Sequence, residues 1–141
     1  MNLRLVTLLL SIVILSSFYK AKNKHIGTWE ATEKKGKKIV MTFGKKGYMM
    51  VEMEGEKFGG ESFEKEGKLH SMTYKTDYSF SPAHIDIILT ELESGTTEAA
   101  LGIFDFPEKH KMRMVADAKG KGRPDSFDND DTLVFTRVGA K

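Results

Sequence analysis

Gly27-Thr28-Trp29-Glu30-Ala31-Thr32 is the stretch that decides the fold. It holds the only tryptophan of the chain, and it follows an N-terminal segment rich in apolar residues. In an extended strand Trp29 and Ala31 would share one face, because successive side chains point to opposite sides. Near the other end, residues 132–137 alternate in the same way and finish on Arg137. The sequence therefore predicts a first strand that carries the tryptophan and a last strand that ends on an arginine.

Between these two strands, short alternating runs recur and are separated by turns rich in glycine and charge. No stretch after residue 25 shows helical periodicity. Eight or nine such runs in about 115 residues indicate a sheet that closes on itself, because an open meander would leave a long exposed edge. We therefore predict an all-β fold, a single antiparallel up-and-down β-barrel of about eight strands.

The alternation also predicts which side chains point into the barrel. We expect these positions to be mainly interior: Trp29, Ile39, Met41, Met49, Val51, Ile85, Ile87, Leu101, Ile103, Met112, Met114, Leu133 and Phe135.

The ordered set of motifs along the chain resembles that of lipocalins and their calycin relatives. A Gly-x-Trp opens the first strand at Gly27, and Arg137 closes the last. Between them come Pro82-Ala83-His84-Ile85-Asp86, then Gly102-Ile103-Phe104, then Arg123-Pro124-Asp125-Ser126-Phe127. This succession is similar to a small exported lipocalin-like domain family that is abundant in planctomycetes and found in other bacteria.

The resemblance implies that Arg137 lies across Trp29 and shuts one end of the barrel. It implies a fold but no established activity, so no catalytic residue is transferred from it. Phe104 stands where the family usually has tyrosine, and Val115-Ala116 fall where many members carry cysteine.

Residues 1–17 have the form of a secretory signal, with a short positive start, an apolar run at 5–15 and small residues at its end. The run is too short to span a bilayer comfortably, since that takes about 20 residues. The alternative is an uncleaved anchor, because no Ala-x-Ala pattern appears and Lys20, Lys22 and Lys24 crowd the far flank. We predict an exported protein, periplasmic or extracellular, with a signal peptide over 1–17, a linker over 18–25 and a barrel domain over 26–141. In the alternative, the uncleaved segment anchors it to the membrane.

The charge of the domain argues against nucleic acid as a partner. Of 22 basic residues, Arg4, Lys20, Lys22 and Lys24 precede residue 25, which leaves 18 against 20 acidic residues. A domain near −2 has no general basic field. The chain has no cysteine, so disulfides and lipoprotein attachment are excluded. We expect no stable membrane insertion after signal cleavage.

Methionines and aromatic residues at inward positions suggest a site for a small apolar or amphipathic ligand, since methionine-rich linings adapt to varied apolar molecules. The same residues fit an ordinary core, in which case the filled barrel acts as a surface or envelope interaction domain without a small ligand. The candidate ligand-binding residues are Met49, Val51, Met72, Tyr74, Phe104 and Met112.

The loop after residue 117 offers two further candidates. Arg123 would clamp an anion, or would form an internal ion pair with Asp86 while Phe127 plugs the barrel. Asp125, Asp128 and their neighbours supply oxygen ligands for calcium but lack the spacing of an EF-hand, which favours a solvated turn. The four histidines are scattered, and no nucleophile–base set can be assembled. We therefore expect no metal, no cofactor and no enzyme activity.

Overall fold

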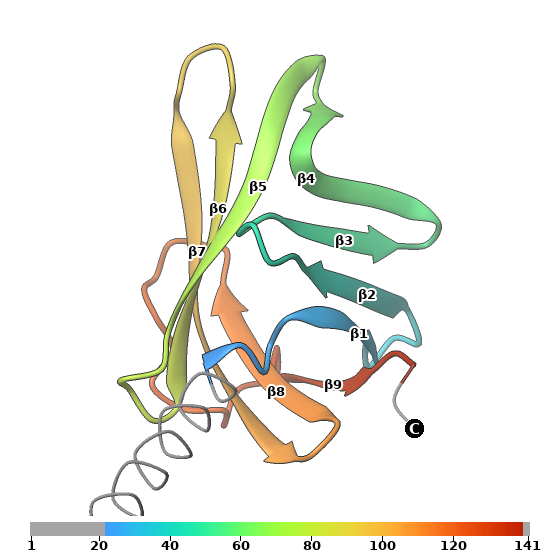
Figure 1. Cartoon of the computed structure of the whole chain (residues 1–141), viewed down its shortest axis with the longest axis vertical. Helices are drawn as coiled ribbons and strands as arrows, with labels where there is room; N and C mark the ends of the chain where they lie inside the picture. The colour runs from blue at the N-terminus through green and yellow to red at the C-terminus, as the bar shows by residue number, and fades with distance from the viewer. Residues whose placement is uncertain (1–21, 140–141) are drawn as a thin grey trace, which may run out of the picture.

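The computed structural model describes residues 22–139, and this part of the chain is almost entirely β-structure. Each strand pairs antiparallel with the next, and the last pairs back with the first, so the sheet is a closed up-and-down barrel (Figure 1). This confirms the predicted all-β barrel, with nine strands in place of about eight. The expected signal or anchor over residues 1–17 lies outside the described residues. The strands are β1 Gly27–Thr32, β2 Lys38–Phe43, β3 Met49–Met53, β4 Glu56–Lys65, β5 Lys68–Asp77, β6 Ala83–Glu91, β7 Thr97–Glu108, β8 Lys111–Asp117 and β9 Leu133–Arg137.

The core lies inside the barrel and follows the alternation of the sequence. Most of the positions predicted to be interior belong to one buried cluster or pack against it. Those in the buried cluster are Trp29, Ile39, Met49, Ile85, Met112, Met114 and Phe135. Those packed against it are Met41, Val51, Ile87 and Leu133.

The prediction is wrong for Leu101 and Ile103 on β7. Phe104 belongs to the interior cluster, so its neighbour Ile103 points to the outer face. Ile103 is nonetheless buried, together with its partner Val115 on β8. Residues 118–132 run over this outer face. Alternation does not show which face of β7 points inward, because this strand carries apolar side chains on both faces.

Phe127 does not plug the barrel, contrary to the expectation from sequence. Its ring lies 4.1 Å from the Arg113 guanidinium. Arg113 points outward, because Met112 and Met114 on either side of it belong to the interior cluster. The long loop therefore acts as a strap across the outside of β8.

The strands β4, β5, β6 and β7 are longer than the rest, and this divides the barrel into two parts (Figure 1). The pairing of β3 with β4 ends at Gly59, and the pairing of β7 with β8 begins only at Leu101. Beyond these points the four long strands continue as a sheet that pairs with no other strand of the described chain. We call this part, residues 60–72 and 87–100, the projecting sheet.

Gly59 sits at the bend where β4 leaves β3. Its φ is +107°, and a side chain there would meet the Met49 backbone carbonyl. Gly55, in the preceding turn, has a similar backbone conformation (φ +84°), but a Cβ atom added there would meet no described atom within 4 Å. Gly59→Ala should therefore lower the free energy of unfolding by about 3 kcal/mol, through backbone strain and overpacking together. Gly55→Ala should cost about 1 kcal/mol, from strain alone. Urea unfolding followed by Trp29 fluorescence measures both, and equal losses would rule out the close approach.

Candidate functional site

One end of the barrel is closed by the Arg137 side chain, and we call it the closed end. The Arg137 guanidinium lies 4.2 Å from the Trp29 ring and donates hydrogen bonds to the carbonyls of Ile26, at 2.8 Å, and Lys24. The Trp29 indole Nε1 donates to the His25 carbonyl at 2.7 Å. Residues 24–26 are thereby held across the barrel end. This is the arrangement that the Gly-x-Trp and terminal arginine imply.

His25 fills the interior behind this closure, whereas the sequence predicts a linker over residues 18–25. Its side chain is 4% exposed, and its Nδ1 lies 2.7 Å from the Tyr78 hydroxyl. Four aromatic rings surround the imidazole, with centroids 5.3–6.2 Å away: Phe43, Tyr74, Tyr78 and Phe104. Burial lowers the pKa of His25 to about 4 and raises that of Tyr78 to about 12. No periodicity marks His25, because it precedes the first strand.

The six candidate ligand residues fall into two groups. Met49, Tyr74, Phe104 and Met112 are buried, the most exposed of them at 8%. The Tyr74 hydroxyl donates to the Gly44 carbonyl at 2.6 Å, so its polar atom is also satisfied. Val51 and Met72 are partly exposed and only pack against this core. Met72 lies opposite Gly60, where the projecting sheet begins, whereas Val51 lies on β3 opposite Phe58, outside that sheet.

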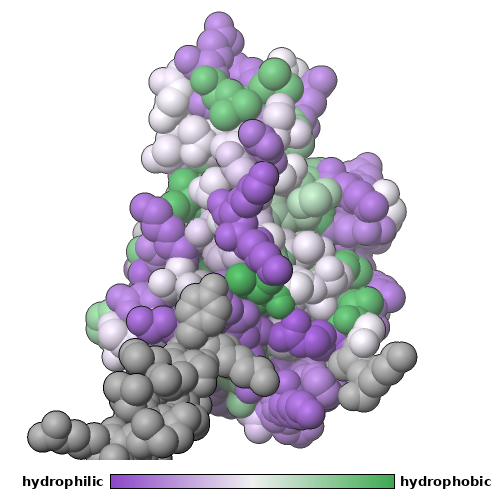
Figure 2. Space-filling view, viewed as in Figure 1, coloured by the Kyte–Doolittle hydropathy of each residue, from purple (hydrophilic) through white to green (hydrophobic). Residues whose placement is uncertain are grey.

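The inner face of the projecting sheet carries a short row of apolar side chains. Met72 on β5 is opposite Leu89 on β6, and Ile87 follows on the same face of β6. All three are partly exposed, and we call them the apolar strip. Figure 2 shows hydrophobic side chains at the upper end of the molecule, where the projecting sheet lies; the strongly exposed apolar residues of this region are Leu69 and Leu92, which do not belong to the strip.

A hollow of about 170 Å³ lies at the far end of this strip. Lys68 donates hydrogen bonds to both carboxylate oxygens of Glu91, at 3.0 and 3.1 Å, which lowers the pKa of Glu91. His70 Nδ1 lies 3.0 Å from the Lys68 carbonyl. The inner face thus passes from an apolar strip to a charged hollow. Its lining is Lys65, Glu66, Lys68, His70, Leu89, Glu91, Thr96 and Glu98.

Arg123 and Asp86, the candidate ion pair, are in contact. Arg123 Nη2 lies 2.7 Å from the Asp86 carboxylate, and Nη1 donates to the carbonyls of Ile85 and Gly102 at 3.1 and 2.7 Å. Three acceptors of the chain itself therefore engage this guanidinium. The arrangement fits the ion-pair interpretation, in which Arg123 pins the strap to β6 and β7, and not an anion clamp.

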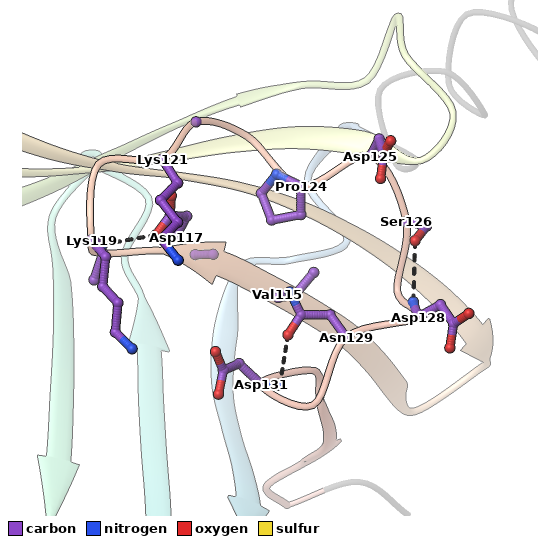
Figure 3. A pocket seen from close by; sticks show the side chains of 13 residues that line it. Val115, Asp117, Lys119, Lys121, Pro124, Asp125, Ser126, Asp128, Asn129 and Asp131 are labelled. Atoms are coloured by element: carbon purple, nitrogen blue, oxygen red, sulfur yellow. Dashed lines mark hydrogen bonds between the residues drawn. The ribbon is translucent and has the colours of Figure 1, made fainter.

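A second cavity, of about 510 Å³, lies between the strap and β8 (Figure 3). Figure 3 shows Asp125, Asp128 and Asp131 spread around the loop without converging on one point. Within the loop, the Ser126 hydroxyl and the Asn129 amide oxygen accept backbone N–H groups. Among residues 22–139, no group of three or more His, Asp or Glu is placed to hold a metal ion. These contacts are typical of a turn-rich surface loop.

Comparison of the chain with protein-family models, with curated proteins and with solved structures gives no match in any of the three. The lipocalin-like resemblance therefore stays a prediction that rests on the motifs, whereas the barrel is a structural finding. Over residues 22–139, no helix is long and apolar enough to cross a membrane.

Replacing Arg137 should weaken the closed end. Arg137→Ala removes the stack on Trp29 and leaves two carbonyls without their donor, so the free energy of unfolding should fall by roughly 1–3 kcal/mol. Lys34→Ala is the matched control, because it breaks the ion pair with Asp130 between two largely exposed side chains. Such pairs contribute about 0.5 kcal/mol. Urea unfolding of both variants gives the comparison, and losses of equal size would contradict a closing role for Arg137.

The buried imidazole predicts a pH dependence of stability. In the unfolded chain His25 takes up a proton near its ordinary pKa of about 6.5, whereas the folded protein does so only near 4. Between these values the unfolded state binds more protons, so stability should fall as pH is lowered, by about 3 kcal/mol in total. Well above pH 6.5 the imidazole of His25 is neutral in both states, so it contributes no pH dependence there.

Urea midpoints between pH 7.5 and pH 4 measure this effect. His25→Gln, whose amide takes up no proton, should flatten the curve in this window. A slope that survives His25→Gln would show that other groups cause it.

Proposed function

We propose that this chain is an exported, lipocalin-like barrel that binds a small apolar or amphipathic molecule on the inner face of its projecting sheet. The observation that carries the proposal is the apolar strip of Met72, Ile87 and Leu89, which continues the core outward and stays partly exposed. Covering apolar surface of this kind with a ligand contributes about 25 cal/mol per Å² to the favourable free energy of binding.

The charged hollow sets the shape of such a ligand. Sites for drug-sized molecules usually measure about 300–1,000 Å³. The hollow of about 170 Å³ is smaller, so it suits a polar end group. Lys68 and Glu91 would orient that group, while the apolar part of the ligand lies along the strip. Ligand sites commonly combine apolar walls with a few polar groups in this way.

The second candidate is a filled barrel that acts through its surface, as an envelope interaction domain without a small ligand. The packing of the closed-end half favours it. Phe43 and Tyr74 meet edge to face with centroids 5.1 Å apart, as do Tyr78 and Phe104 at 5.4 Å. Such contacts occupy the centre of this half of the barrel with the chain's own side chains.

A matched pair of variants on one strand separates the two candidates. Met72 points to the inner face of β5, and Leu69 points to the outer face, where it is 56% exposed. Met72→Gln should reduce binding of a dansylated fatty acid about tenfold, since it places an amide against the apolar part. Leu69→Gln should leave binding unchanged. Fluorescence titration measures both affinities.

Native mass spectrometry of protein purified from its own host, followed by lipid extraction, supplies the second test. A bound small molecule that is retained in Leu69→Gln and lost in Met72→Gln would support the inner-face site. A clean apo mass, together with no measurable binding of the dansylated probe, would favour the filled barrel.

A further inference from the structure

The charges of the described chain are unevenly placed. Five segments surround the closed end: residues 22–26, 44–47, 77–82, 107–110 and 137–139. Together they hold six Lys and Arg residues and only two carboxylates, Asp77 and Glu108, a net charge of +4. Without Arg4, Lys20 and Lys141, residues 22–139 carry 19 basic and 20 acidic residues, a net charge of −1. The rest of the described chain is therefore near −5.

Contacts through His25 and Arg137 bring these segments together. His25 touches Phe43, which precedes the turn at 44–47, and bonds Tyr78 in the loop after β5. The Arg137 backbone N–H donates to the His110 carbonyl at 2.9 Å, and its guanidinium bonds residues 24 and 26. We call this set of segments the basic rim.

The lysines of the rim are not neutralised by the chain itself. Within residues 22–139, none of them forms an ion pair, and Lys24 instead lies 4.6 Å from the Phe106 ring. Lys22, Lys45, Lys46 and Lys109 are exposed. Their positive field therefore faces solvent. These lysines are Lys22, Lys24, Lys45, Lys46 and Lys109.

Phe80 adds an exposed aromatic ring to the rim. It is 50% exposed and lies flat on His84, with the ring centroids 3.8 Å apart and the planes within 5°. Basic side chains together with an exposed aromatic ring are typical of surfaces that rest in the headgroup region of a membrane.

The sequence that precedes the described residues joins the domain at the basic rim. The apolar run at 5–15 is followed by residues 16–21, and the described chain begins at Lys22, on the rim. Six residues span at most about 20 Å. A membrane that takes up the apolar run during export or anchoring is thus within reach of the basic rim.

We propose that the basic rim docks on an anionic lipid surface, with its lysines near the phosphates and Phe80 at the headgroup level. The charge separation orients the barrel, because the acidic remainder is repelled by the same surface. The projecting sheet then points away from the membrane and stays open to solvent. This orientation does not depend on whether the inner face binds a ligand.

The absence of cysteine allows a direct test of orientation on the full chain. A fluorophore is attached through Ser79→Cys, beside Phe80, or through Glu93→Cys, in the turn between β6 and β7. Each labelled protein is mixed with phosphatidylcholine vesicles that contain a nitroxide-labelled lipid as quencher, with or without phosphatidylglycerol. The bound fraction on each kind of vesicle is measured by co-sedimentation, so that the quenching of bound protein reports orientation and not attachment.

With phosphatidylglycerol, the label at position 79 should be quenched several-fold more than the label at position 93. High salt should reduce the difference, as should the charge reversal Lys45→Glu/Lys46→Glu. The control Lys34→Glu/Lys35→Glu makes the same charge change in the β1–β2 turn, at the opposite end of β1, and should leave the difference intact. Equal quenching of both labels, or a difference that the rim reversal does not alter, would overturn the proposal.

Discussion

The contact between Arg137 and Trp29 is the constraint on which the rest of the structure depends. In the pairing of β9 with β1, Trp29 lies opposite Arg137 and Glu30 opposite Thr136. The backbone hydrogen bonds that close the barrel therefore extend over a short length. The planar guanidinium adds a stack on the indole and donors to two carbonyls, a combination that a lysine ammonium does not offer. It thereby ties the two ends of the domain to the segment that precedes β1.

Closure at this end determines where the interior is packed and where it is open. Once residues 24–26 are held across the barrel, His25 enters the aromatic cluster and takes up the space there. At the other end, β4 to β7 are longer than their neighbours, and within residues 22–139 no other strand covers the inner face of the projecting sheet. The two candidate functions correspond to these two halves, one packed and one open.

Much of the barrel was predictable because its strands are short and most are apolar on one face only. The turns and inward positions of β2, β6 and β8 follow from alternation, as Ile39, Ile85 and Met112 show. Strand β7 is the exception. Because it has apolar side chains on both faces, Ile103 was predicted to point into the barrel. The candidate site was predictable only as a set of inward residues. Met49 and Met72 have the same pattern, yet one is buried and the other is partly exposed.

The amino-acid sequence by itself determined the strands and their antiparallel order, because these depend on local alternation and on turns. The contact of Arg137 with Trp29 was expected only from the resemblance of the motifs, and alternation alone does not predict it. Only the tertiary structure decided that His25 belongs to the core, that Phe127 lies outside the barrel and that the inner face is open beyond Gly60. These features arise from contacts between residues far apart in the chain and from unequal strand lengths on neighbouring strands. Local periodicity records which face a side chain takes, but not whether another part of the chain arrives to cover it.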